Sequence, residues 1–497
     1  MITLSPIASR ILRWSGLVVG SLALIALALC AFAFVVNWHD EPLSPQARAL
    51  LAPPPNPLKP EDNIYLAMAG FTAPSGASVI AAGVDRIGHY NEHLDAVLHD
   101  PSGQALDSLT LRVANALEFA GQAEFVHPLT ASLWDEVPPH REEIAALSAA
   151  NGELYRRYLA LQRLPGYYET ARPSYLAPAV YVPTEVRYLF LEDTVLRLRG
   201  TQAPELRAAL DALIADIGLW RRVLTGQGLL ISKMLALAYL QSDYLVLADM
   251  IADPRAAVPT EPGDADRVAP VFALGDFDLG GAFAAEFRVQ ASLLEQTEYL
   301  YASGWSPQPG VPRGWTDSLG SKISAHFFKL NATVNLFAQQ AGSLAALRPG
   351  AGVAAADKQL ADSSLAAWSL IGAYNPIGKL LAGIAAPAGV TYPLRAWDAA
   401  ALQRLVRAGY EIRRQRIAPA DIGAFLAQHP EWSTHPGDHR PFVWEPGSAE
   451  IRVQTIGEQP EGRRFSMRIW RAAAPEPVRA PGPPGLGAPL APPAPPR

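Results

Sequence analysis

The chain has 497 residues, 49% of them hydrophobic, so it is long enough to bury a large core and to hold two or three domains. A formal net charge of −6 excludes the uniformly basic character of a dedicated nucleic-acid binder, and we expect no nucleic-acid partner. Because Cys30 is the only cysteine, the chain can form no internal disulfide and no cysteine-based zinc site.

An uncharged apolar segment, SGLVVGSLALIALALCAFAFVV, occupies residues 15–36. At a rise of about 1.5 Å per residue, a helix of this length matches the hydrocarbon core of a bilayer. Arg10 and Arg13 precede the segment and two acidic residues follow it, so the positive-inside bias predicts cytoplasmic residues 1–14. Since the composition is typical of a GC-rich bacterial genome, we expect a single-pass protein of the inner membrane, anchored in the lipid bilayer, with its bulk in the periplasm.

Two other fates of this N-terminal segment are disfavoured. A cleavable signal peptide has a shorter apolar region and a more polar stretch before its A-x-A site. Here the triplet Ala31–Ala33 lies inside the apolar run, which favours a retained signal-anchor. A lipoprotein needs a small residue before the modified cysteine, whereas Leu29 precedes Cys30.

The next stretch, residues 37–60, contains APPPNPLKP and is predicted to be an extended, proline-rich spacer. Residues 61–416 show apolar side chains at helical spacing, as in Pro204–Leu224, and predict a helical extracytoplasmic domain. Within it, Leu229–Ile251 is apolar but interrupted by charged residues such as Lys233. It is therefore predicted to be a core helix rather than a second membrane span.

Three long loops rich in proline and glycine separate the predicted helices, at residues 164–183, 252–270 and 302–315. Connections of this length are uncommon inside a domain and are often functional, so we expect a groove beside one of them. Aromatic side chains gather in two of these loops and can anchor the loops or stack on a ligand. They are Tyr167, Tyr168, Tyr175, Tyr181, Trp305 and Trp315.

The pattern changes after the helical domain. Residues 417–471 are predicted to form a helix and a three-strand antiparallel meander, because RPFVW, EIRVQTI and RRFSMRIW alternate between apolar and polar residues around turn sequences. The proline-rich residues 472–497 have no apolar periodicity and are predicted to be disordered. The predicted fold class is therefore mainly α, with a small C-terminal β element.

Two segments of the chain resemble known sequences. The pieces IAPADI (Ile417–Ile422) and HPGDHRPF (His435–Phe442) loosely resemble a C-terminal element of proteobacterial envelope proteins and pseudopilin-like sequences, although His435 stands where Asp is usual. The body, including Tyr374–Pro387, is similar to a family of uncharacterised single-pass proteins of Gram-negative bacteria. The resemblance implies a location and an architecture but no chemistry, and its pseudopilin-like part raises the alternative of a secretion-system accessory protein.

One motif raises the hypothesis of a zinc-dependent hydrolase. His89, Glu92 and His93 form H-x-x-E-H, which on a helix places both imidazoles on one face with Glu92 as general base. Glu169 lies at a spacing suited to a third ligand in the pitrilysin-type family, which the motif resembles. That family surrounds its site with much β-sheet, and little is predicted here. We therefore favour a solvated polar helix face.

Two further clusters are weaker candidates. His429, His435 and His439 could bind a metal, but the prolines among them favour a turn before the hairpin. The run Gly372–Leu380 lacks the spacing and the hydroxyl of a phosphate loop, and Asn375-Pro376 predicts a turn that leads into an apolar helix. With no cofactor or catalytic set expected, we favour a non-catalytic binding or scaffolding role, with an envelope protein or the cell wall as partner.

Overall fold

The computed structural model describes residues 6–470 apart from residues 101–103, 112, 123–125, 127–128, 130, 201, 257, 260, 262, 304–314, 350–353, 356–357, 359–371, 386–388 and 458–463. The predicted proline-rich tail therefore lies outside the described residues, and so do most of the loop 302–315 and its Trp305. Trp315 begins a helix, but its side chain is also outside the description.

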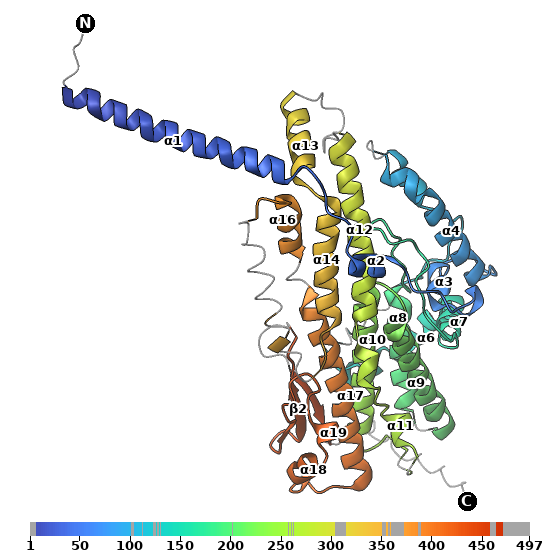
Figure 1. Ribbon diagram of the computed structural model, residues 1–497. Helices are drawn as coiled ribbons and strands as arrows, with labels where there is room; N and C mark the ends of the chain where they lie inside the picture. Colours follow the sequence, from blue (N-terminus) through green and yellow to red (C-terminus); the bar gives the residue numbers. More distant parts are fainter. Residues whose placement is uncertain are drawn as a thin grey trace, which may run out of the picture.

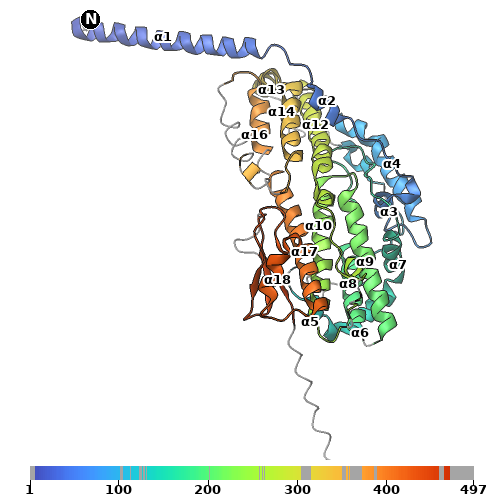
Figure 2. The same ribbon diagram turned by 60° about the horizontal axis from the view of Figure 1, so that its bottom comes forward.

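Helix α1 (Pro6–Val36) stands apart from the rest of the molecule in both views (Figures 1 and 2). Its stretch Trp14–Val36 has a mean hydropathy of 2.7, and none of it is buried inside the protein. Helix α10 (Leu230–Ala252) is the other described helix that is long and apolar enough to cross a membrane, but 61% of its apolar window is buried. The prediction of a core helix there is confirmed, and α1 is a candidate membrane span.

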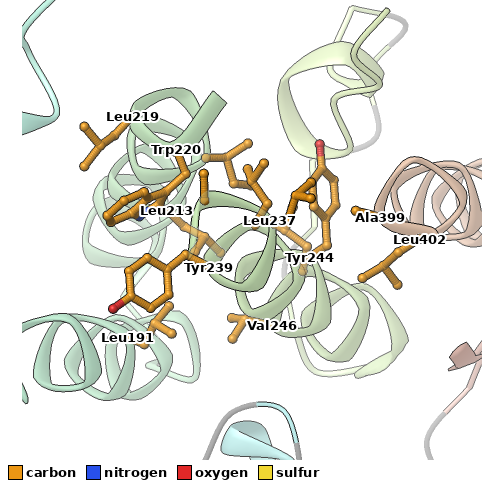
Figure 3. Packing of buried hydrophobic residues seen from close by; sticks show 14 of the residues in the cluster. Leu191, Leu213, Leu219, Trp220, Leu237, Tyr239, Tyr244, Val246, Ala399 and Leu402 are labelled. Carbon is orange, nitrogen blue, oxygen red and sulfur yellow. The ribbon is translucent and has the colours of Figure 1, made fainter. Parts of the chain in front are cut away.

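The main core forms where α8 (Thr184–Leu198), α9 (Ala203–Thr225) and α17 (Thr391–Gln415) pack around α10. Figure 3 shows side chains from these helices meeting there, among them Trp220 from α9 and Tyr239 from α10. Because α10 has neighbours on several sides, its apolar residues surround the helix instead of forming one stripe. The position of α9 matches the helix predicted from Pro204 to Leu224.

Several mostly short elements lie beside α8 and α9, and two helices of this part, α3 and α4, approach each other unusually closely. A Cβ atom on Gly70 would lie 1.9 Å from the carbonyl oxygen of Val79, and one on Gly83 would lie 1.8 Å from that of Leu66. Only glycine permits this contact between α3 and α4. The elements of this part are α3 (Ile64–Ala69), α4 (Val79–Leu98), α5 (Leu133–Glu136), α6 (Arg141–Ala150), α7 (Gly152–Leu161), α11 (Ala265–Val268), and the 3-10 turns η1 (Pro60–Asp62), η2 (Gln104–Leu109), η3 (Pro138–His140) and η4 (Leu274–Phe277).

A second, smaller core lies at the end of the body nearest α1 (Figure 1). It is built by α12 (Gly280–Ser303), α13 (Trp315–Phe327), α14 (Leu330–Ala345), α16 (Pro376–Ala385) and α2 (Pro45–Leu51). Helix α16 begins directly after Asn375, whose φ is 50°, so the predicted turn into an apolar helix is confirmed.

Helix α2 corrects the prediction of an extended spacer over residues 37–60. Pro45–Leu51 is helical, starts on the side-chain cap of Ser44, and buries Ala47 against α12 and α14. Asn37 is fully buried as well. The proline pattern concealed this helix because proline is well tolerated in the first turn, and a seven-residue helix has little periodicity of its own.

The C-terminal element is a meander, as predicted. Strands β1 (Val443–Glu445), β2 (Glu450–Gln454) and β3 (Arg464–Arg468) form an antiparallel sheet in the order β1-β2-β3. Ile451 and Val453 on β2 and Met467 on β3 are buried, and the sheet packs on α17. The short helices α18 (Ile422–Gln428) and α19 (Pro430–Ser433) precede it.

Candidate ligand-binding groove

Two adjoining cavities lie beside the loop of residues 164–183. The larger, of about 510 Å³, is lined by this loop and by the first turns of α10. The smaller, of about 290 Å³, lies between α4 and α12. Both are lined by Pro53, Arg172, Pro173 and Arg288, so they are neighbours along one surface. We refer to the two cavities together as the groove.

Helix α4 holds one side of the loop through its polar face. Asn91 donates from Nδ2 to the carbonyl of Thr170 and accepts from the amide of Arg172. The Arg172 guanidinium makes two hydrogen bonds to Asp95, at 2.7 and 2.8 Å. This ion pair is solvent-exposed and stabilises the fold by less than about 1 kcal/mol, so its effect is mainly to place the loop. Asn91 and Asp95 of α4 thus have a structural role, because both bind the loop of residues 164–183.

A carboxylate forms the polar centre of the larger cavity. Oε1 of Glu169 accepts hydrogen bonds from the hydroxyls of Tyr167, at 2.7 Å, and Ser232, at 2.6 Å. Behind it, the ammonium of Lys233 donates to the carbonyls of Val223 and Gly226. Burial lowers the pKa of Lys233 to about 8, although the nearby carboxylate of Glu169 acts in the opposite direction.

Arg288 is the charged group shared by both cavities. Its side chain is only 8% exposed, and its Nη1 donates to the carbonyl of Leu50 at 3.1 Å. Burial lowers the pKa of this guanidinium. Over the part of the chain that the structure describes, no carboxylate forms an ion pair with Arg288. A buried cation without a carboxylate partner is costly and is a natural contact for a polar group of a ligand.

Most of the remaining lining of the larger cavity is apolar or aromatic. Tyr65, Tyr168 and Tyr181 line it together with prolines and alanines of the loop. Ile231 also lines it and is 71% exposed, which is unusual for a large apolar side chain. The lining is typical of a site for a largely apolar ligand with a few fixed polar contacts.

The structure brings only two of the residues of the zinc hypothesis, His89 and His93, side by side. His89 and His93 lie one turn apart with ring centroids 4.2 Å apart, as the motif predicts. However, Nε2 of His89 contacts the carbonyl of Ser108 at 2.7 Å, and Nδ1 of His93 contacts the carbonyl of His89. An imidazole nitrogen facing a carbonyl carries the proton, which leaves Nδ1 of His89 and Nε2 of His93 as the nitrogens that could accept a metal.

The proposed third ligand and the proposed base are also placed elsewhere. The carboxylate of Glu169 is in the groove, bound to two hydroxyls, while Glu92 is exposed on α4. No group of three His, Cys, Asp or Glu side chains suited to a metal occurs among the described residues. The spacing in the sequence suggested that Glu169 could join the histidines as a third ligand. In the structure, the loop turns its side chain toward Ser232 of α10.

The three C-terminal histidines likewise do not converge. His435 is fully buried, with Nε2 3.0 Å from Asp398 Oδ1 and Nδ1 accepting from the amide of Gly437. His439 is exposed, and the ring of His429 stacks on Trp432. The predicted turn before the hairpin is present at residues 436–438. His435 therefore has a structural role, and the three rings do not meet at one site.

The sequence pointed to the loop but not to its partners in the groove. Tyr168 and Tyr181 line the groove as the predicted aromatic loop residues, whereas Tyr175 is exposed and does not line it. Ser232 and Arg288 were missed because each is one of several polar residues on a long helix and belongs to no motif. The sequence signal was limited to a break in an apolar run.

Comparisons with known proteins identify no relative: no protein-family model, curated protein or solved structure matches this chain.

Proposed function

We propose that the chain is a single-pass protein of the bacterial inner membrane whose periplasmic body binds a mainly apolar ligand in the groove. Helix α1 supplies the anchor, with the basic residues Arg10 and Arg13 on the cytoplasmic side. The observation that carries the binding role is the larger cavity of the groove, which is mainly apolar and has the carboxylate of Glu169 and the buried guanidinium of Arg288 at its walls. The wider envelope family suggested by sequence resemblance is compatible with this role.

The side chains of the groove support binding better than catalysis. Ser232 donates its proton directly to Glu169, with no imidazole between them, and Lys233 donates to two backbone carbonyls instead of to the serine. An acyl-transfer site needs a base that can take the proton of the hydroxyl and pass it to a leaving group. Here the polar groups are instead fixed by structural partners and are suited to orienting a ligand.

The binding role is tested by photo-crosslinking in cells. We expect Ile231→p-benzoylphenylalanine to yield an adduct of defined mass on irradiation, because this side chain is exposed at the groove. The same substitution at Val443, which is exposed on β1, is the matched control. Filling the groove with Ala177→Trp should abolish the adduct. An adduct that survives this change, or that forms equally at Val443, would refute the assignment.

The proposed membrane topology, with the body in the periplasm, is tested in the same strain. Alkaline phosphatase fused after the C-terminus is active only outside the cytoplasm, and we expect an active, membrane-bound fusion. An inactive fusion, or one recovered in the soluble fraction, would contradict the topology independently of the groove.

A further inference from the structure

The end of α1 is attached to the body by specific contacts. Asn37 accepts from the backbone amide of Asn375 at 2.7 Å and donates to the carbonyl of Ala373, just before α16. The ring of Phe34 stacks on His326 of α13 with centroids 3.8 Å apart. These contacts hold α13 and α16 next to the place where α1 ends.

A further contact joins the junction to α14. Asp40 accepts hydrogen bonds from the amides of Asn331 and Ala332, at 2.7 and 3.1 Å, in the first turn of that helix. Both views show α1 leaving the body on the side where α16 lies (Figures 1 and 2). If α1 crosses a bilayer, α16 therefore lies close to the surface of that bilayer.

The helices at this junction expose apolar side chains. Leu380 and Ile384, one turn apart on α16, are 51% and 69% exposed, and Ile323 on α13 is 48% exposed. Trp38, directly after α1, is 63% exposed. A helix that places large apolar residues outward beside a membrane anchor matches the pattern of an interfacial membrane contact.

The charge of this region is suited to anionic headgroups. Residues 315–385 carry five Lys and Arg and three Asp and no Glu, a net charge of +2, whereas the whole chain carries −6. Four of the six lysines of the protein lie there, although basic residues elsewhere are almost all arginine. The nearby junction adds two negative charges, Asp40 and Glu41, and both carboxylates bind α14: Asp40 caps its first turn, and Glu41 accepts from Asn335. Long basic side chains can reach phosphate groups while apolar neighbours enter the acyl region.

We propose that the exposed face of α13 and α16, with Ile323, Leu380 and Ile384 as apolar contacts and Lys322 and Lys379 as cations, rests in the headgroup layer of the bilayer that α1 crosses. The occupant of this face is an anionic phospholipid surface. The proposal rests on the proposed role of α1 as the membrane span. This face is then a second contact with the membrane besides α1. It limits rotation of the body about α1 and so sets the orientation of the groove relative to the membrane.

The test uses the full chain in vesicles of phosphatidylethanolamine and phosphatidylglycerol. In a Cys30→Ser background, the variants Ile384→Cys and Val84→Cys are labelled with the fluorophore NBD; Val84 on α4 is the control because it is exposed and does not line the groove. We expect the label at position 384 to be quenched by doxyl-labelled lipid and protected from aqueous iodide by roughly threefold relative to position 84. Equal quenching at the two positions overturns the proposal.

Two further experiments distinguish a failure of the second membrane contact from a failure of α1 as the membrane span. The native Cys30, labelled in the unsubstituted chain, reports the span: if it is quenched by doxyl lipid and position 384 is not, the anchor stands and the second contact fails. Lys322→Glu with Lys379→Glu should release the label at position 384 from phosphatidylglycerol vesicles but leave Cys30 inserted. Protection of position 384 in native membranes but not in pure lipid vesicles would mean that a protein covers this face, which also overturns the proposal.

Discussion

A buried arginine between two carboxyl groups dominates the electrostatics of the main core. Nε of Arg187 lies 3.2 Å from Asp216 on α9, and its Nη2 lies 2.5 Å from Asp243 on α10, with all three side chains fully buried. Asp216 also accepts a hydrogen bond from Tyr158 at 2.6 Å. Burial raises the pKa of Asp243 well above its usual value despite the attraction of Arg187, and a hydrogen bond with Asp216 acts in the same direction. The cluster is neutral when Asp243 is protonated.

Replacing the arginine tests this arrangement. Arg187→Met leaves two buried carboxyl groups without a cation, and we expect a loss of about 3–5 kcal/mol in the free energy of unfolding at pH 7. A carboxyl whose pKa is raised by folding stabilises the fold at low pH, and this contribution is lost as the pH rises through the folded pKa. The loss should therefore be smaller at pH 5 than at pH 7 in urea titrations, and an equal or larger loss at pH 5 would contradict this account.

Asp243→Asn is the matched control for the same cluster. The amide keeps the shape of a neutral carboxyl, so we expect a change within about 1 kcal/mol at pH 7 and a weaker dependence of stability on pH.

At the scale of elements, Asp398 connects the C-terminal sheet to α17. This buried carboxylate on α17 lies 3.0 Å from Nε2 of His435 and accepts from the amides of Ile456 and Gly457, at 2.9 and 3.0 Å. In the chain, His435 precedes β1, whereas Ile456 and Gly457 follow β2. A single side chain therefore fixes both ends of the β1–β2 hairpin against the helix.

Removing this carboxylate should loosen the whole sheet. We expect Asp398→Ala to cost about 3 kcal/mol in the free energy of unfolding, because it leaves three donors without their acceptor in a site that excludes water. Asp421→Ala is the control, since Asp421 is exposed and its side chain does not cap α18. Urea unfolding followed by tryptophan fluorescence measures both variants. A loss as small as that of the control would show that apolar packing alone holds the sheet.

At the scale of the whole molecule, the chain after α1 is part of the body. Asn37 and Asp40 bind the elements of the second core, and α2 places Ala47 inside it. Between this helix and η1 the chain runs along the groove, which Pro53 lines. The candidate membrane span, the second core and the groove are thus consecutive parts of one structure.

Hydrogen exchange tests this connection. In the full chain we expect slow exchange over residues 45–51, because α2 can open only by leaving its core. Ala47→Asp places a charge in that core and should raise the exchange rate of this peptide at least about tenfold. Ala49→Asp changes an exposed position of the same helix and should have little effect. Fast exchange in the unsubstituted chain would contradict a docked α2.

Features that depend on residues close together in the sequence could be predicted from the sequence. The apolar run of α1, the charged interruptions that mark α10 as a core helix, and the alternation of Ile451 and Val453 on β2 each express a local period or hydropathy. The aromatic loop likewise indicated where the groove lies.

Contacts between distant residues were decided by tertiary packing alone. Glu169 meets Ser232, and Arg288 borders both cavities, because α10 and α12 pack beside the loop, and no local pattern encodes that arrangement. For the same reason the spacing of H-x-x-E-H could not show that Glu169 turns away from the histidines, and the prolines before η1 could not show that Ala47 finds a core. Hydropathy and backbone propensity act over a few residues, whereas a binding surface depends on which helices share a core.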